Sequence, residues 1–584
     1  MIHWSFEICP FVIDFSVSLW LICKSPVTGR NDEAMSKFYL TTPLYYVNDK
    51  PHIGHAYTEI AADALARFRR LKTDEVFFLT GTDEHGLKID QAAQKAGMTP
   101  KHFADQVVQR FLEAWKRLGI SYDDFLRTTE IRHTRTVENV LKILYEKGDI
   151  YLSEYEGWYC TPCETFWTEI QLKGEGQGAR GKGQEEEQEQ KGLVCLDCKR
   201  AVERIKEKNY FFRLSKYQRW LIDYIRSHPR CIQPSTRRQE ILSFLEQPLN
   251  DLCISRPKER LQWGIPIPFS NDHVTYVWFD ALINYITAVD YLEYLEGSRV
   301  KGQGSREMRF TKFWPADVHL IGKDILRPHA VYWPIMLNAL GVEIPKQIFA
   351  HGWWTLPTHT TDGQAGAGQE KISKSKGNIV DPMEVTERYG VDVFRYFLLR
   401  EVPFGQDGTY SEEALIQRFN SDLANDLGNL FHRTLTMVEK YFNGIVPSAK
   451  GTSRIPQDLE SLIRSLPEEL DHTMENLDFS SALGALWRRI NRANKFIEEV
   501  KPWALEKAND MEGLSQVIYR LVDLLRIVTI ALFPFMPHAA GKMWEQLNLD
   551  GMIQKSQLKD LTVGRTASGI KIRKGEPLFP RIES

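Results

Sequence analysis

Hydrophobic positions follow two different periods along the chain, and the change divides it into two parts. In the first part, residues 37–46 and 75–86 are runs rich in β-branched and aromatic side chains, which predicts buried strands. Residues 56–71 and about 101–118 carry apolar side chains at helical spacing. This strand–turn–helix–strand order predicts an α/β fold with a Rossmann-type parallel sheet and helices on its faces.

The second part, from residue 411 onward, has helical spacing throughout. The predicted helices cover 411–442, 457–476, 480–508 and 512–546. We therefore expect an all-α bundle to follow the α/β part.

Three segments depart from these patterns. Residues 173–192 are low-complexity with almost no apolar content, which predicts a solvated loop, and 357–369 are a Gly/Thr-rich insert. Residues 11–23 resemble the apolar part of a signal peptide, but they include an acidic residue, lack a basic flank and are too short to span a bilayer. Because a strand-like run follows Met35 at once, we expect the true start at Met35 and an upstream extension or targeting remnant in 1–34.

Composition and charge exclude some classes of protein. With 43% hydrophobic and 26% charged residues, the 584-residue chain is of ordinary globular composition, and its length predicts about four domains. The net charge of -3 excludes a protein coated in basic charge, but a local basic face would suffice for nucleic acid. No run approaches the roughly 18 apolar residues of a membrane helix. We expect a soluble, cytoplasmic protein with no membrane partner.

Four of the eight cysteines form two C-x-x-C pairs, Cys160 with Cys163 and Cys195 with Cys198. Four thiolates at this spacing are typical of a closed, structural zinc site. The 31 residues between the pairs exceed the usual spacing, but the surplus is the polar segment 173–192, and loop-closure entropy grows slowly with length. The alternative is two redox-active or metal-free pairs.

A P-H-I-G-H sequence lies between the first predicted strand and helix, where parallel sheets bind ligands. His52 and His55 could donate hydrogen bonds to phosphate oxygens, and the helix N-terminus adds partial positive charge. Gly54 would let a nucleotide approach the backbone closely. Two solvated turn histidines are the alternative interpretation.

A K-I-S-K-S sequence at 371–375 forms, with the following lysine, a short cationic loop that could neutralise a triphosphate and close over it. Alone, such a loop is usually a solvated run of charge. Because the two motifs occur together and in this order, their joint occurrence is a far more specific indication of a nucleotide site than either motif alone.

With both motifs, the chain resembles the class I aminoacyl-tRNA synthetases, whose HIGH and KMSKS signatures occur here as HIGH and KISKS. The resemblance extends to the methionyl-tRNA synthetase family and spans about Phe38 to Ile582, apart from the two inserts. It is carried by FYLTTPLYYVNDKPHIGHAYT, FLTGTDEHG, GWYCTPCETFW, NYFFRLSKYQ, YVWFDALINYI, HLIGKDILRPHAVYWP, HGWWT, NDLGNLFHR and KPWALEK.

The resemblance implies a two-step ligase reaction. The carboxylate of L-methionine attacks the ATP α-phosphate to give methionyl-adenylate and pyrophosphate, and the acyl group then passes to initiator and elongator methionine tRNAs, releasing AMP. The catalytic residues would be His52 and His55, contacting the phosphates, with Lys371 and Lys374 clamping the triphosphate. The implied ATP site also includes Gly54, Lys323, Asp324 and Ser373. Mg²⁺ would accompany ATP, although the sequence shows no dedicated carboxylate cage for it.

The resemblance also places a methionine pocket, with Asp83 as the candidate for the substrate ammonium. The implied walls are Leu44, Tyr46, Trp278, Ala281, Leu282, Tyr285, Ile325 and His329. Aromatic and aliphatic walls suit an unbranched thioether. Taken one at a time, the aromatic residues could equally be ordinary core.

Two further sites follow from the resemblance. The four cysteines match a zinc knuckle near the tRNA acceptor end, with one structural Zn²⁺ per chain. Asn429, Arg433 and Trp503 match positions that read the anticodon. These residue types suit base edges, phosphates and base stacking, whereas a helix-surface pair and a core tryptophan are the alternative.

The predicted organisation has seven segments. They are an N-terminal extension (1–35), the first catalytic half (36–150), a connective insertion with the knuckle (151–255), the second catalytic half (256–356), the KISKS loop with a stem-contact region (357–410), an anticodon-binding bundle (411–546) and a C-terminal tail (547–584). We expect no further tRNA-binding domain after this tail, and we expect a monomer.

Three alternatives compete with this function. Synthetases for isoleucine, valine or leucine carry a large editing domain, for which residues 150–255 are too few. A cysteinyl-tRNA synthetase would use a metal in its pocket. A non-catalytic tRNA-binding protein on this scaffold would have lost the phosphate-contacting histidines or lysines, which are all present.

Overall fold

The computed structural model describes residues 35–160, 165–167, 172, 193–195, 200–299, 308–359, 365–371, 380–448 and 456–582. The extension 1–34 and the segment 173–192 lie outside these residues. Ser36–Ser584 form one compact unit.

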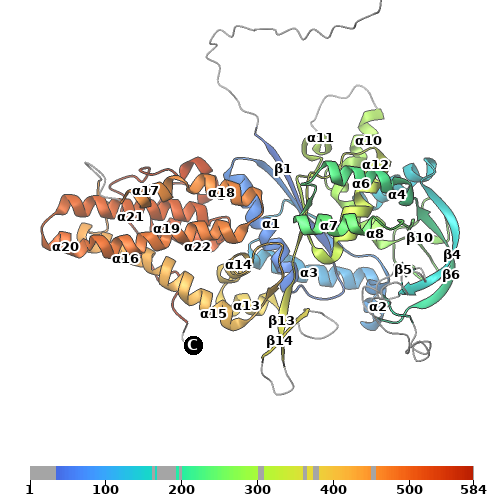
Figure 1. Cartoon of the computed structure of the whole chain (residues 1–584), viewed down its shortest axis with the longest axis horizontal. Helices are drawn as coiled ribbons and strands as arrows, with labels where there is room; N and C mark the ends of the chain where they lie inside the picture. The colour runs from blue at the N-terminus through green and yellow to red at the C-terminus, as the bar shows by residue number, and fades with distance from the viewer. Residues whose placement is uncertain are drawn as a thin grey trace, which may run out of the picture. The chain divides into compact units, whose positions relative to one another are not determined.

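Six parallel strands form the central sheet, which confirms the predicted fold class (Figure 1). In spatial order they are β3 (Asp124–Arg127), β2 (Glu75–Asp83), β1 (Lys37–Tyr46), β11 (Val318–Gly322), β12 (Ile348–His351) and β7 (Ile232–Gln233). Along β1, Phe38 and Leu40 pack into one buried cluster and Tyr39 into another. Because helices cover both faces, successive residues from Phe38 to Thr42 are all buried and the strand does not alternate between apolar and polar positions.

The two buried clusters correspond to the two faces of the sheet. The cluster of Phe38 takes in residues of α1 (Ile53–Leu71), α2 (Leu87–Lys95), α3 (Pro100–Leu118), α13 (Pro382–Tyr389) and α14 (Val391–Arg400). The cluster of Tyr39 takes in residues of α4 (Ile131–Glu146), α6 (Gln218–Ser227), α7 (Ser235–Phe244), α8 (Val277–Leu282), α9 (Asn284–Thr287), α10 (Tyr291–Arg299), α11 (Arg309–Phe313) and α12 (Trp333–Leu340).

Smaller sheets surround the central one. The predicted connective insertion contains an antiparallel sheet in the order β5–β4–β6–β8, made of β5 (Thr165–Trp167), β4 (Ile150–Cys160), β6 (Glu203–Phe212) and β8 (Leu252–Cys253). Two further sheets pair β9 (Ser255–Pro257) with β10 (His273–Thr275), and β13 (Trp354–His359) with β14 (Ala365–Lys371) and β15 (Gly408–Thr409).

The structure differs from the sequence-based expectation at three places in the α/β part. Helix α1 begins at Ile53 and not at residue 56, because His52 caps it, and histidine is not a usual capping residue. Strand β7 belongs to the central sheet although it lies inside the range expected for the connective insertion; two residues are too few to show a period. The insert 357–369 is partly a hairpin, because β13 and β14 pair across it.

The helical half follows the prediction, with breaks that the hydrophobic spacing did not show. Its helices are α15 (Glu412–Arg418), a π-helical segment (Phe419–Gly428), α16 (Asn429–Phe442), α17 (Gln457–Arg464), α18 (Leu466–Glu475), α19 (Phe479–Val500), α20 (Pro502–Lys507), α21 (Met511–Leu532) and α22 (Pro537–Gln546). The predicted helix 480–508 is broken at Lys501, which has φ 51°. Proline at position 502 disfavours helical backbone in the residue before it.

Arg395, which forms a buried ion pair with Asp63, joins the helices on the sheet to the helical half. The guanidinium of Arg395 on α14 lies 2.7 Å from the carboxylate of Asp63 on α1, and neither side chain is exposed. Arg395 also donates to the carbonyl oxygens of Leu118, Pro534 and Phe535, so it ties α1 and α3 to the turn between α21 and α22. Helix α1, which His52 caps, is therefore anchored directly to the bundle.

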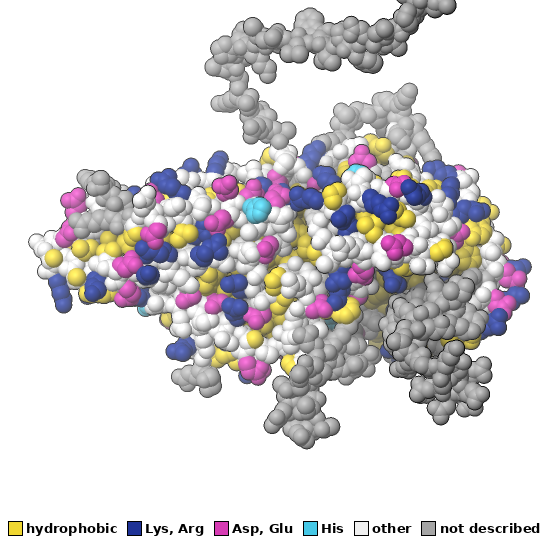
Figure 2. Space-filling view, viewed as in Figure 1, with side chains coloured by type: hydrophobic (Ala, Val, Ile, Leu, Met, Phe, Trp, Pro, Cys, Tyr) yellow, Lys and Arg dark blue, Asp and Glu magenta, His cyan; other side chains and the backbone are white. Residues whose placement is uncertain are grey.

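The surface and the tail complete the described structure. Asn420 bonds in both directions with the backbone of Ile582, so the tail packs back on the start of the bundle. In the face shown in Figure 2, Lys and Arg side chains are interspersed with Asp and Glu, as expected from the small net charge. Among the described helices, none is long and apolar enough to cross a membrane.

Candidate active site

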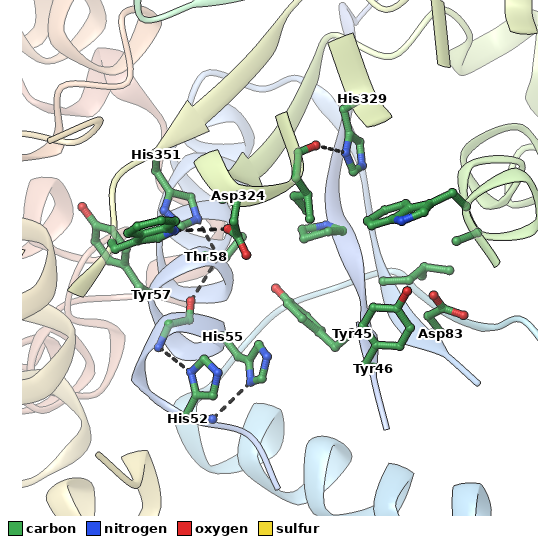
Figure 3. Close-up of a pocket in the computed structure, with 18 of the residues that line it drawn as sticks. Tyr45, Tyr46, His52, His55, Tyr57, Thr58, Asp83, Asp324, His329 and His351 are labelled. Atoms are coloured by element: carbon green, nitrogen blue, oxygen red, sulfur yellow. Dashed lines mark hydrogen bonds between the residues drawn. The ribbon is translucent and has the colours of Figure 1, made fainter. Parts of the chain in front are cut away.

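A pocket opens at the carboxyl ends of β1, β2, β11 and β12, where parallel sheets bind ligands. Its volume is about 350 Å³. All nine residues expected to hold methionine line it, together with His52, Gly54, His55 and Asp324 from the expected ATP site. Figure 3 shows His52 and His55 at one end of this pocket and Tyr46, Asp83 and His329 at the other.

His52 and His55 cap helix α1 reciprocally. The backbone N–H of Gly54 donates to Nδ1 of His52 at 3.0 Å, and the backbone N–H of His52 donates to Nδ1 of His55 at 3.1 Å. Their rings stack with centroids 3.8 Å apart. Because Nδ1 accepts in both, the proton of each neutral ring sits on Nε2, which is a hydrogen-bond donor. Both histidines are half-buried parts of the helix cap that also line the pocket, and their contact with phosphate stays a prediction.

Gly54 is required by the packing of its neighbour. A Cβ at this position would lie 2.9 Å from Cε1 of His52. A side chain at this position would therefore force the His52 ring to move from its place over the first turn of α1.

At the end of the pocket that is expected to hold methionine, His329 and Tyr285 form a buried hydrogen-bonded pair. Nδ1 of His329 donates to the carbonyl oxygen of Ile325 at 2.8 Å, and its Nε2 accepts from the hydroxyl of Tyr285 at 2.8 Å. Burial lowers the pKa of His329 to about 4, outweighing its bond to Ile325 and the charge of Asp324. The ring is therefore uncharged at neutral pH, which suits an apolar thioether substrate.

Asp83 carries the negative charge of this end. It is the last residue of β2, is 2% exposed, and lies opposite Tyr46 in the register of β1 and β2. A buried carboxylate beside aromatic and aliphatic walls can receive a substrate ammonium, and this role of Asp83 stays a prediction.

Helix α8 presents three pocket residues, and a buried carboxylate on the same helix anchors it. Trp278, Ala281 and Leu282 line the pocket. Asp280 accepts from His85 and from His133, each at 2.7 Å. Burial raises the pKa of Asp280, but the two histidines outweigh this and hold it below its usual value. Asp280 therefore stays ionised and ties α8 to the segment that follows Asp83.

The expected nucleotide residues Lys323 and Asp324 have different surroundings. Asp324 lines the pocket and accepts from the indole N–H of Trp353 at 3.2 Å. The ammonium of Lys323 does not line it; it lies 4.0 Å from the centroid of the Trp353 ring and bonds to Asp407 at 2.5 Å. Lys323 thus braces Trp353 behind the pocket wall.

Part of the expected site lies outside the described residues. Lys371 is the last residue of β14, where only the backbone is described, and Ser373 and Lys374 fall in the undescribed segment that follows. Their roles stay predictions. The hairpin β13–β14 nevertheless leads directly from the pocket residue Trp354 to the start of the KISKS loop.

The cysteine knuckle is described in half. Cys160 and Cys195 are fully buried in one small cluster with Leu172, whereas Cys163 and Cys198 lie outside the described residues. Two of the four expected ligands are thus brought together, as a zinc site requires.

The candidate anticodon residues lie on the bundle surface. Asn429 and Arg433 are one turn apart on α16, and Arg433 pairs with Glu498 at the end of α19 at 2.7 Å. Trp503, on α20, is 37% exposed. The alternative of a core tryptophan is therefore wrong.

Sequence reasoning missed several residues of the pocket wall. His351 bonds to the hydroxyl of Thr58 at 2.7 Å through Nε2, and Tyr57 packs edge-on against the His351 ring. Lys88 also lines the pocket. One signal was available: His351 ends a strand of the parallel sheet, so its side chain was expected at the ligand-binding edge.

Comparison with known families assigns the class. Residues 38–435 match the family model described as tRNA synthetases class I (M), and residues 457–567 match the anticodon-binding domain of tRNA ligase. A match over most of the sheet and its insertions places the fold and pocket in the class I tRNA synthetases.

Curated relatives and solved structures specify the family. The chain is 48% identical to a methionine–tRNA ligase of Caldanaerobacter subterraneus subsp. tengcongensis, covering 94% of this chain and 79% of that one, and 47% identical to the enzyme of Clostridium tetani, covering 94% and 78%. The structure of Mycobacterium tuberculosis methionyl-tRNA synthetase in complex with methionyl-adenylate superposes with a TM-score of 0.82 at 39% identity, covering 94% of this chain and 100% of that one. The chain belongs to the methionine–tRNA ligase family.

Proposed function

We propose that the chain attaches methionine to methionine tRNAs, consuming ATP and forming methionyl-adenylate as the intermediate. The observation that carries this is one pocket with a histidine-capped helix N-terminus at one end, the buried carboxylate of Asp83 at the other, and mainly apolar and aromatic walls between them. One end suits phosphate and the other suits the ammonium and thioether of methionine.

The chemistry needs positioning and charge stabilisation rather than a protein nucleophile. One carboxylate oxygen of methionine attacks the α-phosphorus of ATP, and pyrophosphate leaves with the bonding electrons. The Nε2–H groups of His52 and His55 would donate to phosphate oxygens as their charge redistributes. Their Nδ1 atoms are already used by the helix cap, so both donors are oriented before ATP binds.

Lysines of the KISKS sequence complete the phosphate end in this proposal. Lys371 and Lys374 would neutralise the triphosphate and the leaving pyrophosphate, and ATP would enter as its Mg²⁺ complex. The support is the hairpin β13–β14, which begins at the pocket wall and ends at Lys371.

A structural zinc ion is also proposed. Cys160 and Cys195 fit it, because they are buried side by side in a cluster too small to be stable as a hydrophobic core alone. With Cys163 and Cys198 they would supply a closed set of four thiolates, whose role is to hold the knuckle together.

Recognition of tRNA is assigned to the helical half. Asn429, Arg433 and Trp503 would contact anticodon bases, which is supported by the exposure of the Trp503 ring and by the ion pair that holds Arg433 beside the start of α20. We further propose a monomer acting in the cytoplasm.

ATP–pyrophosphate exchange tests the proposal. We expect exchange with methionine and none with leucine, isoleucine, valine or cysteine at equal concentration. Exchange that is equal or better with any of these four would contradict the methionine assignment. Absence of exchange with every amino acid would contradict the proposed enzyme activity itself.

A further inference from the structure

Lys88 is the one Lys or Arg side chain among the described residues that line the pocket. It is the second residue of α2, and its ammonium lies 5.1 Å from the centroid of the Tyr46 ring. In the described part of the chain it forms no ion pair with a carboxylate; its contact is with the face of Tyr46.

The stability of α2 does not account for a lysine at this position. A helix N-terminus carries partial positive charge, so a cation there is unfavourable. The rest of α2 follows this rule, with Asp90 in the first turn and Lys95 in the last. Lys88 places a positive charge in the first turn of α2, where a negative one is favoured, and no ion pair among the described residues compensates for it. We therefore infer that the function of Lys88 is to bind a ligand.

The position of Lys88 matches a specific group of the substrate. Asp83 and Lys88 come from the same segment, and Tyr46 lies between them: it is opposite Asp83 in the sheet register and beneath the Lys88 ammonium. The ammonium and carboxylate of an amino acid are attached to one carbon, so their receptors must be neighbours. If Asp83 binds the ammonium of the substrate, the cation that binds its carboxylate must therefore lie close to Asp83, and Lys88 has this position.

We propose that Lys88 binds the carboxylate of methionine while Asp83 binds its ammonium, an inference that rests on the proposed function. Together they would orient the amino acid so that one carboxylate oxygen faces the ATP α-phosphorus at the His52 and His55 end. The other oxygen keeps its contact with Lys88 and becomes the carbonyl oxygen of the adenylate.

This role predicts a particular kinetic signature. The carboxylate loses its charge as the oxygen–phosphorus bond forms, so the attraction to Lys88 is stronger for bound methionine than for the transition state. Removing the charge should then raise KM for methionine more than it lowers kcat.

Binding of methionine and of L-methioninol tests the assignment, because methioninol keeps the ammonium and thioether but has a hydroxymethyl group in place of the carboxylate. Both dissociation constants, and that of ATP alone, would be measured by calorimetry on the wild type and on Lys88→Gln and Lys88→Arg. Lys95→Gln is the matched control, since it removes the same charge from the exposed end of the same helix.

In Lys88→Gln we expect the methionine Kd to rise about tenfold or more, as for loss of a charge-assisted hydrogen bond. Methioninol and ATP should bind as before, the melting temperature should not fall, Lys88→Arg should retain most of the affinity, and Lys95→Gln should have no effect. An unchanged ratio of methioninol to methionine affinity in Lys88→Gln would overturn the proposal, as would a weakened ATP affinity, which would assign Lys88 to phosphate. If the wild type failed to bind methionine, the proposed function would fall as well, so the two failures are distinguishable.

Discussion

The pocket at the sheet edge and the candidate anticodon residues on the bundle are built in opposite ways. Around the pocket, several polar side chains are buried and held in place by a neighbour, as His329 is by Ile325 and Tyr285. On the bundle, Trp503 is exposed and Arg433 has a surface ion pair. A rigid site suits a reaction that depends on placing atoms, whereas exposed side chains can adapt to a flexible single-stranded ligand.

This difference predicts that substitutions act differently in the two regions. A change in the pocket should alter adenylate formation, and a change on the bundle surface should alter only the tRNA-dependent step. The separation should fail at Arg395, because it pairs with buried Asp63 on α1 and also donates to the carbonyl oxygens of Pro534 and Phe535 in the bundle.

The largest expected effect is at Arg395. Arg395→Met removes one of the two arginines that pair with buried Asp63, the other being Arg67, and leaves the carbonyl oxygens of Leu118 and Phe535 without this donor. We expect a loss of about 3–5 kcal/mol in the free energy of unfolding, and a parallel loss of both activities. Denaturant unfolding measures it, with Arg488→Met as the control, because that arginine is 56% exposed and its pair is worth at most about 1 kcal/mol. Equal effects of the two variants would contradict the anchoring role.

The next effect is on catalysis at His55. His55→Ala should lower ATP–pyrophosphate exchange by about 10²-fold or more, roughly 2.7 kcal/mol, because it removes a preoriented donor to phosphate. It should also cost about 1 kcal/mol of stability, because the backbone N–H of His52 loses its acceptor.

His55→Asn separates these two roles. Its side-chain oxygen can accept from the His52 N–H, but it has no donor at the place of Nε2. We expect the exchange rate to fall as in His55→Ala while the melting temperature stays near that of the wild type. Near-normal exchange in His55→Asn would show that the histidine acts only as a cap.

Glu59 should make stability depend on pH. It accepts from Thr42 and Thr80 beneath the pocket, and burial raises its pKa to about 7 in spite of these bonds, from an ordinary value of 4.5. Between these values the folded protein binds a proton that the unfolded chain releases, so the free energy of unfolding falls as pH rises.

Glu59→Gln removes that dependence. The difference in stability between Glu59→Gln and the wild type should therefore shift in favour of the variant between pH 4.5 and pH 8. The shift should be at most about 3 kcal/mol in the free energy of unfolding, at 1.36 kcal/mol per pKa unit, and the melting temperatures of the two proteins at both pH values measure it. We also expect ATP–pyrophosphate exchange with methionine to be retained in Glu59→Gln, because Glu59 does not line the pocket. A stability difference that is the same at both pH values would contradict the raised pKa.

The sequence predicted well what depends on hydrophobic period and on the order of elements. The alternation of β1 between two buried faces and the long helices of the bundle are of this kind, and so is the convergence of His52 and Asp83 at one edge. The resemblance to a known family supplied the nine residues of the expected methionine pocket. The structure brings all nine together in one pocket.

What the sequence did not show depends on contacts between distant residues. The two residues of β7 join the sheet only because β12 pairs with them. The capping role of His52 and His55 requires two rings to stack, and the anchoring of α8 requires Asp280 to meet histidines from two other segments. Neither hydrophobic periodicity nor local secondary-structure propensity predicts contacts between residues that are far apart in the sequence.

The most direct test of this account is Trp503→Ala, with exchange, aminoacylation and melting temperature measured on one preparation. A stacked base is worth about 1–3 kcal/mol, so aminoacylation efficiency should fall about 5- to 150-fold. Because Trp503 is exposed and remote from the pocket in the fold, exchange with methionine and the melting temperature should remain those of the wild type. Parallel loss of exchange, aminoacylation and stability would contradict the division of labour between sheet and bundle.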